Sequence, residues 1–154
     1  MNGHGRGRIK YIIDTNLYIE ATRNDEAAEA LKAFYQRNLP HVFLHSVVAQ
    51  ELLAGASRPD SHQAVLKNLI EPFEAVRRII TPDHGEWKRA GEIRASLVRR
   101  KEISPRGCPP SFLNDCLIAA SARNHGIVII TRNLSDFRLI SLVHPTAVLA
   151  PWPV

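Results

Sequence analysis

The sequence lacks the features that mark several common kinds of protein and site. It has only two cysteines, Cys108 and Cys116, and no C-x-x-C pair, so it encodes neither a zinc ribbon nor a redox dithiol, and we expect both thiols to be reduced. No apolar run comes near the roughly 20 residues that a membrane span needs. The apolar stretch behind the basic N-terminus stops at Asp14, too early for a signal peptide. These absences predict a soluble, cytoplasmic protein.

The remaining composition is typical of one globular domain. The 154 residues are 45% apolar and 23% charged, which is an ordinary balance for a folded chain. Lysine and arginine outnumber aspartate and glutamate by 20 to 15, and the sequence pI is about 9.6. This excess mildly favours a polyanionic partner. We expect residues 9–154 to form the domain and the Gly- and Arg-rich residues 1–8 to be a flexible extension.

Short apolar runs alternate with amphipathic segments along the chain, which is typical of an α/β protein. The runs lack polar alternation, so they indicate parallel strands covered on both faces. The sequence thus predicts a mostly parallel central sheet of about five strands with helices on both faces. The expected strands are residues 8–13, 41–45, 75–80, 127–130 and 146–149, and the expected helices are a short one near Asn16 and residues 24–37, 47–55, 63–70, 83–101 and 112–124.

Polar residues, glycines and prolines predict where these helices begin and end. Asn16, Ser46 and Ser111 have side chains that cap helix N-termini well, and each precedes a predicted helix. Gly55 and Pro72 follow helical patterns and are expected to end them.

Two carboxylates follow predicted strands. Asp14 comes directly after the run Tyr11-Ile12-Ile13, and Asp136 lies in the loop after residues 127–130. In a parallel sheet, functional sites gather where the strands end at their carboxyl edge. Each residue also has a purely structural explanation, because Asp14 can begin a turn or cap a helix and Asp136 can cap a turn. Taken singly, both residues leave the two explanations open.

Two further carboxylates are predicted on the apolar faces of helices. The helical neighbours of Glu51 are Val47, Val48, Ala54 and Gly55. A glutamate on such a face needs a partner, a raised pKa or a metal, and a salt bridge to a distant arginine is the structural alternative. Asp115 is expected in the first turn of its helix, where the helix dipole alone would stabilise it.

Together, Asp14, Glu51, Asp115 and Asp136 predict a site built from oxygen ligands. Mg²⁺ and Mn²⁺ prefer hard carboxylate oxygens in proteins. A cation held by such groups lowers the pKa of a bound water and orients a phosphodiester for in-line attack. The basic excess of the chain would help to offset the charge of an RNA substrate.

Five segments form a series that spans nearly the whole chain from residue 8. They are YIIDTN (11–16), SVVAQELLAG (46–55), NDCLIAASARNHG (114–126), IVIITRNLSDF (127–137) and the closing APWPV. In their order and intervals these segments resemble the PIN-domain family, in particular the toxin components of VapBC-type toxin–antitoxin modules. The resemblance implies a PIN-like α/β domain that acts as an endoribonuclease with Mg²⁺ or Mn²⁺ as its cofactor, hydrolysing RNA phosphodiesters by metal-activated water.

The resemblance also implies roles for individual residues and partners. The family's acidic site corresponds to Asp14, Glu51, Asp115 and Asp136, with Asp14, Asp115 and Asp136 as metal ligands, and its supporting polar positions correspond to Asn16, Thr131 and Asn133. Further implications are a VapB-like antitoxin that inhibits the enzyme and a homodimer. Some relatives have Asp at the position of Asn133, so the amide here favours one tightly bound metal and leaves a second open. Residues 1–8 exceed the family's usual start and are either incidental or an additional RNA contact.

Basic residues are dense between positions 88 and 106. A run of like charge on a helix is usually a solvated surface. The competing hypothesis is a wall that contacts RNA phosphates and leads to the loop before Asp115. Its candidate members are Arg99, Arg100, Lys101 and Arg106.

Histidine and aromatic residues suggest no further catalytic group. His41 and His45 share a strand face and are expected to pack there rather than to bind zinc. No histidine adjoins an acidic motif, so the sequence predicts no histidine base. Trp87 and Phe112 are expected in the core, whereas Trp152, between two prolines, is either a terminal plug or a partner contact.

Two other functions compete with the ribonuclease. A catalytically inactive PIN-like RNA-binding or scaffold protein is the first alternative, and the presence of all four acidic positions argues against it. A phosphatase with Asp14 as nucleophile would need D-x-D after the first strand, whereas this chain has Asp14-Thr15-Asn16. Nucleotide binding of the P-loop or dinucleotide kind lacks its glycine-rich loop.

Overall fold

The predicted strands form one five-stranded sheet in the computed structural model of the protein, which describes residues 7–154. The strand order is β3-β2-β1-β4-β5, and every neighbouring pair is parallel. The α/β class and the parallel central sheet are therefore confirmed. The strands are β1 (Lys10–Ile13), β2 (Val42–His45), β3 (Ile79–Ile80), β4 (Ile127–Ile130) and β5 (Val148–Leu149).

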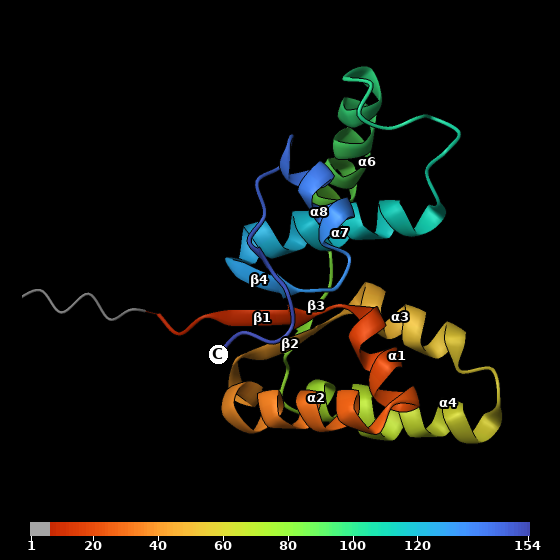
Figure 1. Cartoon of the computed structure of the whole chain (residues 1–154), viewed down its shortest axis with the longest axis vertical. Coiled ribbons are helices and arrows are strands. Elements are labelled where there is room, and N and C mark those ends of the chain that lie inside the picture. The colour runs from red at the N-terminus through yellow and green to blue at the C-terminus, as the bar shows by residue number, and fades with distance from the viewer. Residues whose placement is uncertain (1–6) are drawn as a thin grey trace, which may run out of the picture.

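Helices cover both faces of the sheet, as predicted (Figure 1). One side carries α6 (His84–Arg99), α7 (Pro110–His125) and α8 (Leu134–Ser141). The other side carries α1 (Thr15–Arg23), α2 (Asp25–Asn38), α3 (Ser46–Gly55) and α4 (Pro59–Val65). Two short helical segments, η2 (Leu66–Ile70) and α5 (Glu71–Ala75), continue from α4, and the 3₁₀ turn η1 (Leu39–His41) leads into β2.

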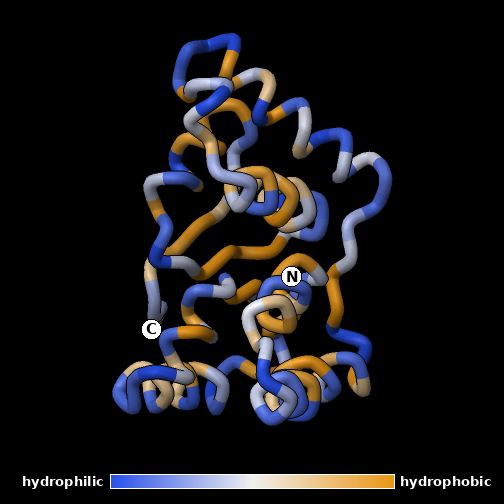
Figure 2. Tube along the Cα trace, turned by 90° about the vertical axis from the view of Figure 1, so that its right-hand side faces the viewer, coloured by the Kyte–Doolittle hydropathy of each residue, from blue (hydrophilic) through white to orange (hydrophobic). Residues whose placement is uncertain are grey.

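The apolar strand residues lie between these two helical layers and form the core. Ile12 of β1 and Ile129 of β4 have no exposed surface, and Figure 2 shows the strands as the apolar centre of the molecule. Phe34 of α2 is also fully buried and packs edge-on against Tyr11, with ring centroids 5.2 Å apart. Core packing therefore fixes the strand ends, and with them any side chain that follows a strand directly.

The first helices after β1 and β2 begin without a connecting loop, so their caps differ from the predicted ones. Asp14, rather than Asn16, caps α1, and its side chain accepts a hydrogen bond from the next backbone N–H. His45, rather than Ser46, caps α3 through its ring nitrogen. Asp14 follows β1 directly and has the capping role that was one of its two explanations, whereas His45 both ends β2 and caps α3, which the sequence pattern alone did not reveal.

The start of α7 is also earlier than predicted. Pro109 is the N-cap and Pro110 is the first helical residue, so Ser111 lies inside the helix. Proline suits the first helical position, because its backbone there needs no N–H donor. Asp115 consequently lies in the second turn of α7, and the prediction that it occupies the first turn is wrong.

The region between α3 and α6 is more helical than predicted. α3 ends at Gly55 as expected, but the following helix begins at Pro59 instead of residue 63 and continues through η2 and α5 to Ala75. Pro72 does not stop it, since it lies in the first turn of α5, where a missing N–H is harmless. β3 is therefore shortened from the predicted 75–80 to Ile79–Ile80.

One of the two predicted core aromatics is on the surface. Phe112 is 2% exposed, as expected, but Trp87 is 59% exposed. The buried position in the first turn of α6 belongs instead to its neighbour Glu86, which is 2% exposed.

The predicted extension, residues 1–8, lies outside the described residues up to position 6, and Gly7 and Arg8 precede β1 without regular structure. Among residues 7–154, none of the helices has both the length and the apolar character needed to cross a bilayer.

Candidate active site

The carboxyl ends of β1 and β4 meet at the point where the strand order reverses. From β1 the chain moves outward through β2 to β3, and it returns to the other side of β1 as β4. Ile13 and Ile130 are paired at the end of these strands, and the Asp14 N–H donates to the Ile130 carbonyl over 2.9 Å. In open parallel sheets, ligands bind in the crevice outside this switch point.

Asp14 is held at this point by hydrogen bonds to both of its carboxylate oxygens. Oδ1 accepts from the Thr15 N–H over 2.8 Å, and Oδ2 accepts from Thr131 Oγ1 over 2.6 Å. Burial raises the pKa of Asp14, although the two hydrogen bonds lower it in part. The two explanations of this residue are thus compatible: Asp14 caps α1 and also faces the end of β4.

Asn133 joins two further carboxylates. Its Nδ2 donates to Asp115 Oδ2 over 3.2 Å and to Asp136 Oδ2 over 2.8 Å, so one amide holds groups from α7 and α8. Its backbone N–H donates to Thr131 Oγ1 over 2.9 Å, which connects it to Asp14 through a single hydroxyl. An aspartate here would add negative charge, whereas the amide supplies the donors that these carboxylates lack.

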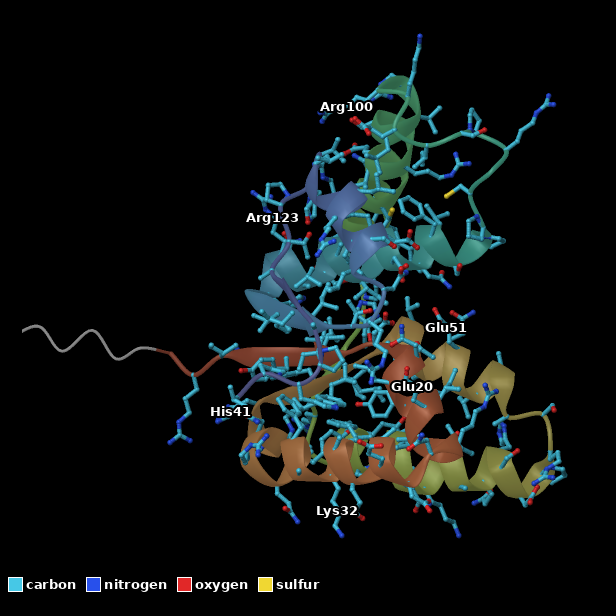
Figure 3. All side chains as sticks on the ribbon, in the orientation of Figure 1. Glu20, Lys32, His41, Glu51, Arg100 and Arg123 are labelled. Carbon is cyan, nitrogen blue, oxygen red and sulfur yellow. The ribbon has the colours of Figure 1, made fainter. Side chains whose placement is uncertain are left out.

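Glu51 reaches the site from α3. It is half-buried, and its Oε1 accepts from Asn114 Nδ2 over 3.2 Å, so among the described residues its partner is this amide rather than a distant arginine. Figure 3 shows Glu51 on the part of α3 that faces α7. The sequence reasoning missed Asn114, although two successive polar residues in an otherwise buried helix were a signal for it.

The four carboxylates lie within electrostatic reach of one another. Asp115 is 8% exposed, and its pKa is raised to about 8. Burial is the main cause, and the second is the negative charge of three neighbouring carboxylates, those of Asp14, Asp136 and Glu51. The hydrogen bond from Asn133 opposes this shift. The structure therefore brings all four predicted acidic residues together, with a negative charge that favours a cation.

The residues fit a hard divalent cation by their chemistry. Carboxylate and amide oxygens are its preferred ligands. Two buried oxygens beside Asp14, Thr15 Oγ1 and Asn16 Oδ1, have no hydrogen-bond partner among the described residues. Within residues 7–154, however, no three His, Cys, Asp or Glu side chains are arranged to hold a metal ion as they stand. The hydrogen bonds from Thr131 and Asn133 occupy carboxylate oxygens that a cation would use.

The basic residues suggested as RNA contacts lie away from these carboxylates. Arg99, Arg100 and Lys101 are exposed at the end of α6, and Arg100 donates to the Leu142 carbonyl over 3.1 Å. Figure 3 shows Arg100 at the far end of the molecule from Glu51.

Two other basic residues lie nearer to the site in the chain. Arg106 is exposed in the loop that leads to α7. Arg132, between Thr131 and Asn133, pairs with Glu20 over 2.7 Å. The sequence reasoning did not single out Arg132, although it stands within the TRN segment.

Proteins of known activity and structure resemble this chain over most of its length. A curated relative from Shigella flexneri, named tRNA(fMet)-specific endonuclease VapC, is 26% identical over 136 residues, which cover 86% of this chain and 92% of the relative. Ribonuclease VapC2 from Haemophilus influenzae is 28% identical over 138 residues, which cover 87% of this chain and 95% of the relative.

Solved structures share the fold. The DNA-bound VapBC complex from Salmonella typhimurium matches with a TM-score of 0.69 and 24% identity, covering 93% of this chain and 98% of the other. FitAcB from Neisseria gonorrhoeae matches with a TM-score of 0.67 and 23% identity, covering 94% and 99%. The family model described as PIN domain matches residues 11–141. The chain therefore belongs to the PIN domain family.

Proposed function

We propose that this protein is a VapC-type endoribonuclease, the toxin of a toxin–antitoxin pair, which hydrolyses phosphodiester bonds of RNA. The observation that carries the proposal is the convergence of four carboxylates at the switch point of the sheet, with the pKa of Asp115 raised to about 8 by burial and by its acidic neighbours. The names of the relatives, an endonuclease and ribonucleases, support the reaction.

The proposed cofactor is Mg²⁺ or Mn²⁺, held by Asp14, Asp115 and Asp136. Such a cation, when bound, lowers the pKa of water and neutralises the charge of a phosphodiester. The hard oxygen ligands and the concentrated negative charge around Asp115 support this assignment. Asn133 favours one tightly bound cation, because it adds no negative charge for a second.

The remaining polar residues have positioning roles in this proposal. Thr131 fixes the orientation of Asp14, and Asn133 fixes Asp115 and Asp136. Glu51 is held by Asn114, and we assign it a catalytic role instead: it orients the attacking water and accepts its proton.

The proposed partner is a VapB-like antitoxin that inhibits the enzyme. Its support comes from the VapBC structure of Salmonella typhimurium and the FitAcB structure of Neisseria gonorrhoeae, which contain chains with this fold. We also propose a homodimer and a cytoplasmic location, where RNA is present and the two free cysteines stay reduced. If a gene adjacent to this one encodes a small protein, co-expression of the two and co-purification test the antitoxin, and the mass of the protein in solution tests the homodimer.

Metal-dependent cleavage is the central test. We expect the purified protein to cleave RNA with Mg²⁺ or Mn²⁺ and to stop in EDTA. Asp14→Asn should abolish cleavage, and Mn²⁺ should raise the melting temperature of the natural protein more than that of the variant. Asp60→Asn is the matched control, since Asp60 is exposed and pairs with Arg58 in a surface salt bridge. RNA binding without cleavage by the natural protein would favour the inactive RNA-binding alternative.

A further inference from the structure

A pocket of about 500 Å³ opens between α1, α2 and the C-terminal segment. Among its lining residues are Glu20, Arg23, Asn24, Arg132 and Trp152. We propose that this pocket binds an unpaired base of the RNA substrate, next to the bond that is cut. This inference rests on the proposed ribonuclease function and adds a substrate-positioning subsite to it.

Trp152 provides a stacking surface in this pocket. Its indole packs on Phe34, with ring centroids 5.1 Å apart and an interplanar angle of 30°. Phe34 is fully buried and does not line the pocket, so the core supports one side of the indole while another side faces the cavity. An aromatic ring held in this way stacks on any nucleobase, because every base has a π face.

The ion pair of Glu20 and Arg132 adds hydrogen-bonding groups that can distinguish bases. The Arg132 Nε lies 2.7 Å from the Glu20 carboxylate, and the side chains are 54% and 37% exposed. Both therefore remain accessible beside Trp152 while each fixes the other's orientation. Unpaired RNA bases are recognised by this combination of an aromatic surface with side-chain acceptors and donors for the base edge.

The pocket is joined to the carboxylate site through the backbone. Arg132 lies between Thr131, which binds Asp14, and Asn133, which binds Asp115 and Asp136. Glu20 is on α1, the helix that Asp14 caps, and Figure 3 shows Glu20 on the helix next to that of Glu51.

The volume of the pocket is within the usual range for small-ligand sites and is sufficient for one nucleotide. An RNA strand can thus reach both sites with neighbouring nucleotides.

Fluorescence gives a direct binding test, because the chain has only two tryptophans. Trp87→Phe leaves Trp152 as the single tryptophan, whose emission is excited selectively at wavelengths that tyrosine does not absorb. Adding a short unstructured RNA oligonucleotide of mixed sequence in EDTA should quench its emission, since a stacked base contacts the indole. Trp152→Phe is the matched control: Trp87 is 59% exposed on α6, on the other side of the sheet, and its emission should not change. Equal quenching in both variants, or none in either, would overturn the proposal.

Kinetics test the same pocket during cleavage. Trp152→Leu keeps an apolar side chain against Phe34 but removes the stacking surface, so kcat/KM should fall about tenfold or more for all RNAs. Trp152→Phe should keep most of the natural kcat/KM, and Trp87→Leu should not change it.

Base preference tests the ion pair. Glu20→Gln should change the preferred base in a randomised RNA pool, whereas Glu29→Gln, on an exposed part of α2, should not. Thermal unfolding of each variant verifies the fold.

The outcomes separate this inference from the proposed function. If the natural protein cleaves no RNA, the ribonuclease assignment fails, while the fluorescence test still decides whether the pocket binds RNA. If the natural protein cleaves RNA and the Trp152→Leu and Glu20→Gln variants match it in rate and base preference, only the subsite is overturned. A loss of antitoxin binding in Trp152→Leu with unchanged RNA cleavage would assign the pocket to a protein ligand and would also overturn it.

Discussion

The two ends of α7 each help to bury a carboxylate, and the surroundings of the two groups are opposite. Asp115, in the first half of the helix, has one amide donor and three acidic neighbours, and its pKa is raised to about 8. Glu86 of α6 lies against the other end of α7. It accepts from the Asp83 N–H over 2.8 Å, from Asn124 over 3.2 Å and from Ser121 over 3.5 Å, and it is 3.5 Å from His125.

The surroundings of the two carboxylates imply opposite effects on stability: Glu86 stabilises the fold, whereas Asp115 lowers its stability. Four groups surround Glu86, which is 2% exposed, so its burial leaves few hydrogen bonds unmade. Asp115 is buried among like charges, and such an arrangement persists where function requires it. The Asp83-x-x-Glu86 spacing is a capping box, which the sequence could have revealed. Burial alone therefore does not identify a functional carboxylate, but the charges around it do.

The largest expected effect is on catalysis. Asp115→Asn should lower RNA cleavage by about 10³-fold or more, because it removes a proposed ligand of the cation. Above about pH 8, where Asp115 is ionised, the same variant should unfold at a higher denaturant concentration, since it relieves repulsion among the carboxylates. Glu86→Gln is the matched change at the other end of α7, and its cleavage rate should stay near that of the natural protein. Comparable losses in both variants would show that the two carboxylates do not differ in role.

The second effect is on stability and concerns Glu86. Glu86→Ala leaves the buried donors around it without an acceptor and removes half of the capping box of α6. We expect the free energy of unfolding to fall by about 2–4 kcal/mol. Urea denaturation followed by circular dichroism measures it, with exposed Glu92→Ala on the same helix as a control. A change below about 0.5 kcal/mol would contradict the structural role of Glu86.

The third effect is a dependence of the free energy of unfolding on pH, and its main source is the protonation of Asp115. A raised pKa means that the folded chain binds more protons than the unfolded chain between the ordinary pKa of 3.8 and the folded value of about 8. The free energy of unfolding in EDTA should therefore fall as pH rises, by up to about 1 kcal/mol per pH unit. The raised pKa of Asp14 acts in the same direction.

The best window for this measurement is about pH 7 to 8. The pKa of His45 is lowered from 6.5 to about 4 by burial and by His125, so His45 stabilises the fold as pH rises, but only below this window. Between pH 7 and 8, Asp115→Asn should flatten the slope of the free energy of unfolding against pH, and Glu86→Gln should leave this slope unchanged. Equal slopes in Asp115→Asn and the natural protein would remove Asp115 as its source.

The smallest expected effect is that of the basic end of α6. Arg99 and Arg100 are exposed at the end of α6, and Figure 3 shows Arg100 apart from Glu51, so reversing both charges should change RNA affinity by no more than about threefold at physiological salt. Filter binding at several salt concentrations measures this. A large loss with a weaker salt dependence would place the RNA path along α6, and that prediction from the sequence would be supported.

The strands and the acidic residues were predictable because each has a strong local signal. Short apolar runs such as residues 127–130 are typical of strands covered on both faces, and Asp14 follows such a run. Hydrogen bonds between distant elements were not predictable. No pattern shows that Asn133 of the β4–α8 loop joins Asp115 to Asp136, or that Asn114 holds Glu51, because these contacts depend on how α3, α7 and α8 pack.

The helix starts show a second limit. Sequence patterns favour Ser, Asn and Asp as caps, so they left Asp14 and Asn16 both open for α1. For α3 they favoured Ser46, but this helix begins directly where β2 ends, and His45 at the strand end is its cap. Likewise, Trp87 was expected in the core because it is large and apolar, whereas the cap of α6 needs Glu86 in the buried position.

The hydrogen bonds of Asp14 to Ile130 and Thr131 have a consequence for biosynthesis. Asp14 leaves the ribosome well before its partners and before Asp115 and Asp136, because all of these residues lie more than 100 positions later in the chain. A nascent chain thus has no assembled site until these later residues have left the ribosome. Under the proposed function, the emergence of Asp136, rather than the folding of the first strand, sets the moment at which nuclease activity can begin and an inhibitor is first needed.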